Sequence, residues 1–393
     1  MAQTQLPPRE AIEPDLQFIR EVKAAGGQTL KKCYQCATCS MVCELTPNDK
    51  PFPRKEMIWA GWGQADRLMR DPDVWLCYQC NDCSTYCPRG ARPGDVLAAV
   101  RAYVYKHFAF PAFMGRALAS PKALPALIGV PILILLASIF LFAPQEGGQY
   151  VFMTSEVIDF DYFLPHSSVD ALFVFGNIMI FIFAAVGFTR FWKGLKTPDD
   201  EVKMSFVGAL IPTIKEIIAH KRFRDCGANA PRSWGHMILL FGFIGAMITT
   251  GAILLFVFLP HYIHLLGIES LDSWFTVPID LPHPVKFLGA ISGIGLVVGG
   301  AMLVYRRWTN KDAVGANGYA DYLFLYVIFV TGLTGMLSWG GRLTGIGAVA
   351  YSIYFVHMVS VFFLLWYMPY SKFAHMIYRT LALVRARQTG RLS

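Results

Sequence analysis

Six long apolar stretches dominate the hydrophobic pattern of the chain. Each has about the 20 residues that a helix needs to cross a bilayer, and they lie at 124–143, 171–192, 234–259, 285–305, 320–340 and 347–370. The segment 203–224 is also partly apolar, but it is short and ends in several charges, which favours a helix lying at the membrane interface. The pattern therefore predicts a membrane domain of six spanning helices behind a more polar N-terminal domain.

Shorter helical patterns occupy the N-terminal part. Apolar positions recur at helical spacing over 13–25, two short helices are expected between 51 and 75, and a longer amphipathic helix follows from Pro93 to about Phe108. Residues 109–122 suit an interfacial linker. We expect an all-α protein with three parts: a cysteine-rich domain at 1–108, the linker at 109–122, and a membrane domain with its tail at 123–393.

Composition and charge agree with this division. Of the 393 residues 54% are hydrophobic and 16% charged, which is too apolar for a soluble protein and too charged for membrane spans alone. The net charge of +8 does not indicate nucleic-acid binding, because the basic residues gather at the ends of the apolar stretches. No glycine-rich phosphate loop or paired-carboxylate motif stands out.

The distribution of lysine and arginine orients the spans. The segments 144–168 and 260–284 contain neither residue, whereas the segments after the second and fourth spans and the C-terminal tail are basic. The positive-inside rule then places both termini and the cysteine-rich domain in the cytoplasm. The first 22 residues lack the pattern of a signal peptide, which gives the same orientation. The basic residues after the fourth span are Arg306, Arg307 and Lys311.

Eight of the nine cysteines form two runs with the spacing C-x2-C-x2-C-x3-C, at 33–43 and 77–87. This is the spacing of two-cluster ferredoxins, in which three thiolates of a run ligate one 4Fe–4S cluster and the fourth ligates the other. Zinc is the poorer interpretation because each run holds too many close thiolates for one tetrahedral ion. Disulfides would need an oxidising compartment. We assign one cluster to Cys33, Cys36, Cys39 and Cys87, and the other to Cys77, Cys80, Cys83 and Cys43.

The ninth cysteine, Cys226, stands alone after the predicted interfacial helix. We expect an inert or weakly exposed thiol there rather than a cluster ligand.

Two histidines are expected at one level of the membrane. His236 opens the third span and His375 follows the sixth, and both positions lie on the cytoplasmic side of the predicted topology. Imidazoles from two helices at one level suit the two axial ligands of heme b; the alternative is a pair of solvated histidines at the interface. Arg306, Arg307 and Lys372 lie at this level, and either pair with heme propionates or serve only as topology determinants.

His357 lies in the middle of the sixth stretch, 18 residues before His375, which corresponds to roughly 27 Å along one helix. An ionisable residue inside a span is a functional candidate. Either it ligates a second heme, with Met247 or His283 as candidate partners, or it serves quinone binding or proton transfer.

The remaining histidines carry weaker expectations. His283 together with Lys286 marks a candidate quinone pocket at the outer side. We expect the other outer histidines to be ordinary interface residues and the two cytoplasmic ones to be surface residues; they are His166, His261 and His264, and His107 and His220.

Two families resemble separate parts of the chain. The N-terminal third, with CYQCATCSMVC and WLCYQCNDCSTYCP, resembles the small iron–sulfur subunit of heterodisulfide reductases, HdrC. The C-terminal two thirds resemble the cytochrome b subunit of respiratory nitrate reductases, on the strings SWGHMILLF around His236 and PYSKFAH ending at His375. In that family the span that corresponds to the third one here carries a second histidine after the one that matches His236. The position of that second histidine falls on Ala246 in this chain.

The combination is similar to the membrane subunits of quinone-interacting membrane-bound oxidoreductase complexes, the QmoC family. The resemblance implies a subunit in the bacterial cytoplasmic membrane that exchanges electrons with menaquinone. It also implies HdrA-like flavoprotein partners of the QmoA and QmoB type, and adenylylsulfate reductase as the enzyme served in sulfur metabolism.

We therefore expect an electron-transfer subunit of an oxidoreductase complex, with two 4Fe–4S clusters and at least one heme b, that is not a complete enzyme alone. The alternatives are a related subunit of a heterodisulfide-reducing or sulfite-reducing complex, and a membrane anchor that only docks soluble subunits.

Overall fold

A computed structural model of the chain describes residues 12–47, 50–197, 200–227, 230–265, 279, 281–310, 315 and 318–392. Helices form nearly all the regular structure of these residues. Their only strands are β1 (Gln145–Glu146) and β2 (Gln149–Tyr150), which pair as a short antiparallel hairpin. The predicted all-α fold class is confirmed.

The N-terminal part is built of short helices around the two cysteine runs. The predicted helices at 13–25, within 51–75 and from Pro93 to Phe108 are all present. They are α1 (Leu16–Ala24), η1 (Leu30–Lys32), α2 (Thr38–Met41), α3 (Arg54–Gly61), α4 (Ala65–Arg70), η2 (Pro72–Trp75), α5 (Asp82–Thr85) and α6 (Pro93–Phe108). The segment that we expected to be a linker contains α7 (Ala112–Leu118) and η3 (Pro121–Ala123).

Six helical segments among the described residues are long and apolar enough to cross a membrane, as predicted. Side chains such as Leu141, Phe175 and Leu343 are 74%, 72% and 76% exposed on them, as expected for surfaces that face lipid. The segments are α8 (Leu124–Phe142), α11 (His166–Gly194), α14 (Ala230–Ile253) continued by the π-helical η5 (Leu254–Phe258) and α15 (Leu259–Leu265), α16 (Pro284–Thr309), α18 (Tyr319–Leu343) and α19 (Gly347–Trp366).

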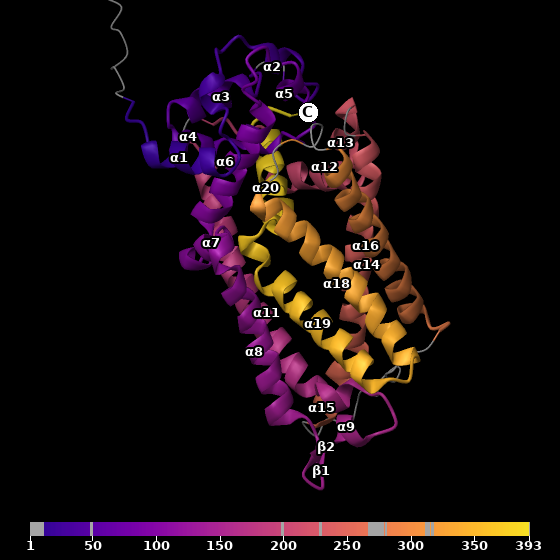
Figure 1. Cartoon of the computed structure of the whole chain (residues 1–393). Helices are drawn as coiled ribbons and strands as arrows, with labels where there is room; N and C mark the ends of the chain where they lie inside the picture. The colour runs from indigo at the N-terminus through magenta and orange to yellow at the C-terminus, as the bar shows by residue number, and fades with distance from the viewer. Residues whose placement is uncertain are drawn as a thin grey trace, which may run out of the picture.

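The spans pack in a row, from α14 to α16, α18 and α19, and α19 also contacts α8 and α11 (Figure 1). Glycines bring α14 and α16 together. A Cβ atom added at Gly242 would lie 2.8 Å from the nitrogen of Leu296, and one at Gly299 would lie 2.6 Å from the nitrogen of Leu239. At these two positions glycine therefore serves close helix packing rather than clearance for a porphyrin.

The sixth span ends four residues earlier than predicted. After Trp366 the chain forms η6 (Met368–Tyr370), η7 (Lys372–Ala374) and then α20 (His375–Gln388). Pro369 has no N–H to continue the helical ladder, which accounts for the break. His357 and His375 consequently lie on different helices, and the spacing of 27 Å along one continuous helix was wrong.

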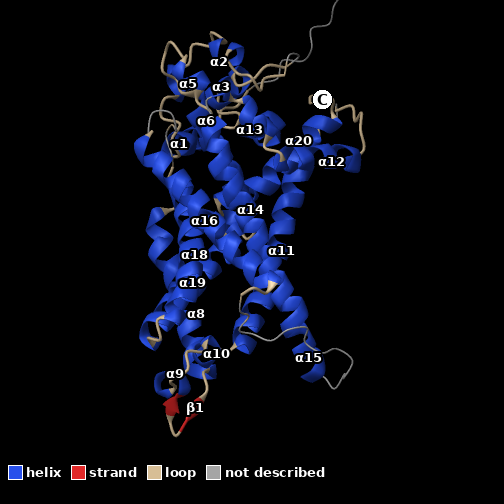
Figure 2. Cartoon of the chain, turned by 90° about the vertical axis from the view of Figure 1, so that its right-hand side faces the viewer, coloured by secondary structure: helices blue, strands red, loops and turns tan. Residues whose placement is uncertain are grey.

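The predicted interfacial helix is also divided. It forms α12 (Phe206–Ile218) and α13 (Lys221–Asp225), with His220 between them in a left-handed conformation. The helix α12 packs against α20. Both helices lie at the end of the molecule that carries α2 and α5, whereas the β1–β2 hairpin and α9 (Val151–Thr154) lie at the opposite end (Figures 1 and 2). α10 (Phe160–Phe163) follows α9. Lys311 lies outside the described residues.

One hydrophobic core joins the N-terminal part to the helices that follow it. Trp75 stacks on Tyr378 of α20, with ring centroids 5.5 Å apart, and its edge meets Phe191 of α11 at 5.6 Å. All three side chains are at most 1% exposed. The cysteine-rich part therefore buries its core against α11 and α20.

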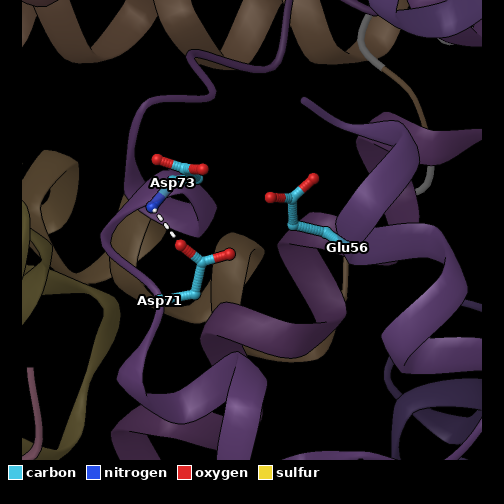
Figure 3. A group of neighbouring side chains, drawn as sticks. All are labelled: Glu56, Asp71 and Asp73. Atoms are coloured by element: carbon cyan, nitrogen blue, oxygen red, sulfur yellow. Dashed lines mark hydrogen bonds between the residues drawn. The ribbon is translucent and has the colours of Figure 1, made fainter. Parts of the chain in front are cut away.

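A buried cluster of charges fastens the C-terminal tail to the N-terminal part. The carboxylates of Glu56, Asp71 and Asp73 point toward one another (Figure 3). The Lys55 ammonium lies 2.7 Å from Asp73, 2.9 Å from Asp71 and 3.3 Å from Glu56, and Arg391 pairs with Asp73. Because an ammonium ion already lies among the three carboxylates, we interpret the group as a structural tie rather than a metal site.

Breaking this tie should destabilise the protein strongly. Arg391→Met keeps most of the side-chain volume but leaves the buried Asp73 with one cation, and removing one partner of a buried ion pair costs about 3–5 kcal/mol. We expect a lower midpoint of thermal unfolding in detergent, and partial recovery in the double variant Arg391→Met/Asp73→Asn. The exposed Arg89 provides a matched control, and equal midpoints for Arg391→Met and Arg89→Met would contradict the prediction.

The same cluster should make stability depend on pH. Burial raises the pKa of Glu56 well above its usual value, and the neighbouring Asp71 carboxylate raises it further. The folded protein then holds this proton more tightly than the unfolded chain, so stability falls as the pH rises above the ordinary value of about 4.3. Glu56→Gln cannot lose a proton, so its unfolding midpoint should exceed that of the unsubstituted protein by more at pH 9 than at pH 6. A difference that does not change with pH would argue against a raised pKa.

Candidate functional site

The two cysteine runs fold into the same loop. Positive φ angles occur at equivalent places, at Gln35 (62°) and Ala37 (68°) in the first run and at Gln79 (56°) and Asn81 (71°) in the second. Such a conformation is unfavourable for residues other than glycine and is retained mostly where function requires it. The repeat in sequence is thus also a repeat in backbone geometry.

The folded loops bring the thiols together in two groups. Cys33 and Cys39 interact electrostatically with Cys36 and Cys87. Cys43, from the first run, interacts with Cys77 and Cys80 of the second run as well as with Cys39, and Cys83 interacts with all four. The two groups match the two ligand sets assigned from spacing.

The surroundings of the sulfur atoms favour thiolates only with help from positive charge. Burial raises the pKa of Cys39 to about 11 and that of Cys43 to about 12. The backbone N–H groups of Gln79 and Ala91 lie 3.3 Å from the sulfur atoms of Cys77 and Cys87. A bound iron cluster supplies the positive charge that keeps such buried thiols deprotonated.

Cys226 lies beside the second group. Its side chain is 2% exposed, and its thiol donates a hydrogen bond to Cys80, which lowers the pKa of Cys80 and raises that of Cys226. Of the two expectations, an inert or a weakly exposed thiol, this burial favours the first. Nothing in the sequence signals its position, because two spans separate Cys226 from Cys87 along the chain.

The structure brings His236 and His375 together. Their ring centroids lie 6.3 Å apart with an angle of 78° between the planes. The Nδ1 atom of His375 donates to the carbonyl oxygen of Lys372 at 2.6 Å, and the Nδ1 atom of His236 lies 2.9 Å from Nε2 of His220. The Nε2 atoms of both rings thus remain available as ligands. Burial lowers the pKa of His375 to about 3, so this ring is neutral, as a metal ligand must be.

Two arginines tie the histidine-bearing helices to the second cysteine loop. Arg232, one helical turn before His236, donates to the carbonyl oxygens of Tyr78 and Gln79, each at 3.2 Å. Arg379, one turn after His375, donates to the carbonyl oxygen of Cys77 at 2.9 Å. The histidine pair and the second cysteine group are therefore held in a fixed arrangement.

A cavity of about 530 Å³ contains both features. Its lining is mostly apolar but has an excess of positive charge, since the carboxylates of Asp321 and Glu21 are already paired with Lys372 and Lys106. Burial lowers the pKa of Lys372 to about 8 despite this pairing. The residues of the wall that matter here are Cys77, Tyr78, Gln79, Arg232, His236, Arg306, Arg307, His375 and Arg379.

His357 lies apart from this cavity. Its Nδ1 atom is 3.2 Å from the hydroxyl oxygen of Thr334 on α18, and its ring packs on Gly335. Among the described residues no other histidine makes a ring contact with it, and Met247 is 45% exposed.

The outer histidines have local partners. His283 caps α16 by accepting from the N–H of Val285, and Lys286 lies 4.7 Å over the ring of Trp339. His166 bonds to Asp161 at 2.7 Å, and its ring lies 5.5 Å from that of His261. These contacts with neighbouring residues give no support to the candidate quinone pocket at His283 and Lys286.

Comparison with known proteins agrees with the cysteine geometry. Residues 29–91 match the family model of the 4Fe–4S dicluster domain. The chain is 35% identical over 88 residues to the C subunit of the H2:CoB–CoM heterodisulfide, ferredoxin reductase of Methanothermobacter marburgensis, covering 22% of this chain and 47% of that protein. It is 32% identical over 102 residues to an Archaeoglobus profundus protein that is itself similar to the C subunit of heterodisulfide reductase, covering 26% and 54%.

One relative extends over both parts of the chain. Citrate utilization protein B of Escherichia coli is 26% identical over 397 residues, which cover 96% of this chain and 95% of that protein. The chain otherwise spans about half the length of the curated heterodisulfide reductase relatives that it matches. No solved structure matches. The chain thus contains an iron–sulfur dicluster domain of the kind used for electron transfer, joined to six candidate membrane helices.

Single cysteine substitutions should separate the two ligand sets. We expect Cys43→Ala and Cys87→Ala each to lower the iron content from about eight to about four atoms, and to remove different signals from the low-temperature EPR spectrum. Cys226→Ala is the control and should keep all the iron. Loss of the same EPR signal in both variants would contradict the exchange of ligands between the runs.

Proposed function

We propose that this protein is the membrane subunit of a quinone-linked oxidoreductase complex. It carries electrons between a quinone in the bilayer and a soluble redox partner, through a heme b held by His236 and His375 and through two 4Fe–4S clusters. The observation that carries the proposal is that the paired imidazoles and the Cys77 loop share one cavity.

The spacing of the imidazoles fits a heme iron between them. Two imidazoles that would share one metal ion, each through a metal–nitrogen bond of about 2 Å, need ring centres separated by more than the length of two such bonds. The observed separation is 6.3 Å. A direct hydrogen bond between the rings is absent from the contacts of the described residues, and the alternative of two solvated histidines suits less well two partly buried rings that line a mostly apolar cavity.

The charge of the cavity fits the propionates of a heme. Nη1 of Arg307 and Nε of Arg379 are buried without a hydrogen-bond partner among the described residues. A buried polar N–H without a partner is costly, and carboxylates are the natural partners of guanidinium groups. The sequence offered Arg306, Arg307 and Lys372 as partners of the heme propionates. Lys372 is already paired with Asp321, so the arginines are the better candidates for binding the propionates.

Heme b, when bound, supplies one-electron chemistry. His236 and His375 would hold its iron, while Arg232 and Arg379 fix the second cysteine loop on the same side of the cavity. The group Cys77, Cys80, Cys83 and Cys43 is then the near cluster, and the group Cys33, Cys36, Cys39 and Cys87 is the far one, toward the soluble partner. Thiolate-ligated clusters tend to low potentials, so electron flow from quinol toward them needs energy coupling in the partner.

For His357 the structure favours the second of its two expected roles. Its contact with the Thr334 hydroxyl and the absence of a ring contact to another histidine in the described spans fit quinone binding or proton transfer better than ligation of a second heme.

The partners belong to the same proposal. Menaquinone as the quinone, HdrA-like flavoproteins of the QmoA and QmoB type, and adenylylsulfate reductase as the enzyme served follow from the resemblance to the QmoC family. The bacterial cytoplasmic membrane, with the cysteine-rich domain inside, follows from the distribution of basic residues. The similarity to the C subunits of heterodisulfide reductases supports a soluble redox partner but does not choose among these.

A second candidate function has one specific observation in its favour. The relative that extends over both parts of the chain is named for citrate utilisation. The soluble partner would then act on a carboxylic acid rather than in sulfur metabolism. Purification of the native complex distinguishes the candidates by the subunits that accompany the protein: HdrA-like flavoproteins, siroheme-containing or heterodisulfide-reducing subunits, or an enzyme that oxidises a carboxylic acid.

Replacing either axial histidine should remove the heme and leave the clusters. We expect His236→Ala and His375→Ala to lose the pyridine hemochrome signal while the iron of the clusters, measured by EPR, is retained. Reduction by a menaquinol analogue in stopped-flow spectra should be lost with the heme.

The exposed His107 provides the matched control, and His107→Ala should retain heme and quinol reduction. If both axial variants assemble and keep quinol-dependent turnover, the protein is only a membrane anchor. If the unsubstituted protein contains no heme b, the proposed electron transfer between quinone and heme in the membrane domain is wrong.

A further inference from the structure

His220 occupies a place that its sequence context does not suggest. It was expected at the surface, yet it is 5% exposed. Its Nε2 atom lies 2.9 Å from Nδ1 of His236, and the ring centroids are 5.1 Å apart. The expectation was wrong because α13 packs against α14, which brings His220, 16 positions before His236, into contact with it.

The hydrogen bonds around His220 fix the positions of the protons. Its Nδ1 atom lies 3.1 Å from the carbonyl oxygen of Ile218, which can only accept, so Nδ1 carries the proton. In an imidazole with its proton on Nδ1, the Nε2 atom is the acceptor, and here it faces Nδ1 of His236. His236 therefore donates from Nδ1, and the lone pair on its Nε2 is left for a metal.

The two axial histidines consequently have different acceptors. His375 donates to a backbone carbonyl oxygen at 2.6 Å, whereas His236 donates to an imidazole nitrogen at 2.9 Å. A carbonyl group of the backbone cannot be changed by substitution, but the acceptor of His236 can. Substitution of His220 therefore measures how the hydrogen-bond acceptor of His236 affects the properties of the heme.

The backbone conformation of His220 is unusual for a residue with a side chain, which indicates that the imidazole itself is needed at this position. The residue has φ 51° and ψ 29°, in the left-handed region that glycine or asparagine would adopt more easily. Histidine at such a position is retained where the surrounding structure or the function demands it. The hydrogen bond to His236 provides that demand.

We propose that His220 is a positioning residue for the heme ligand His236: it holds the imidazole in the metal-binding tautomer and orientation, and it raises the basicity of Nε2. This inference rests on the heme proposed above. A more basic ligand stabilises the ferric state, so His220 lowers the reduction potential of the heme.

Three variants test this proposal. His220→Gly removes the ring and relieves the backbone, His220→Ala removes the ring alone, and His220→Gln restores a neutral acceptor. We measure heme content, the midpoint potential by optical redox titration and the EPR spectrum of the ferric heme. Loss of an outer partner typically weakens metal binding about 10–100-fold. If the ferric state is weakened tenfold relative to the ferrous state, the potential rises by about 59 mV.

We expect a raised potential and altered EPR g values in the Gly and Ala variants, and a return toward the original values in His220→Gln. His107→Gln is the control and should change neither. A full heme complement in His220→Gly, with the original potential and spectrum, would overturn the role of His220 while leaving the proposed heme intact. Heme retained in His236→Ala would instead overturn the proposed ligation itself, so the two failures are distinguishable.

Discussion

The arrangement of the molecule depends on the contact between two guanidinium groups and one loop. Arg232 and Arg379 donate to the carbonyl oxygens of residues 77–79, and each lies one helical turn from a histidine of the pair. The same helices therefore position the imidazoles and hold the second cysteine run. Together with the stacking of Trp75 on Tyr378 and the ion pair of Arg391 with Asp73, this contact fixes the cysteine-rich part on the helices that carry the two histidines.

Buried charge is costly, and this chain places it where a ligand or a partner charge can offset it. Beside the paired imidazoles, Arg307 and Arg379 retain buried N–H groups that lack a hydrogen-bond partner among the described residues, which fits an anionic cofactor. In the N-terminal part, Lys55 and Arg391 offset three carboxylates. The first group points to binding and the second to stability, because the carboxylates of the second group already lie beside cations of the chain.

The errors of prediction share a physical cause. His220 was expected at the surface and Cys226 as an inert or weakly exposed thiol. Both are buried, His220 against His236 and Cys226 against Cys80. Each lies on a short segment between spans, where local hydrophobicity is low and periodicity gives no sign of burial. Their surroundings come from α14 and from the cysteine loop, which are distant in sequence. The break after Trp366, by contrast, had a local signal in Pro369 that the length of the apolar stretch concealed.

The sequence by itself determined the all-α fold, the six candidate spans and the approach of His236 to His375, and its cysteine spacing predicts two ligand sets. Each of these follows from a periodic or spaced pattern, because hydrophobic length and ligand spacing are local properties. Only the tertiary structure decided that the second cysteine loop and the histidine pair line one cavity, that His220 contacts His236 and that His357 lies apart from them. Those relations depend on long-range packing around Trp75 and Tyr378, whose stacked rings join segments about 300 residues apart.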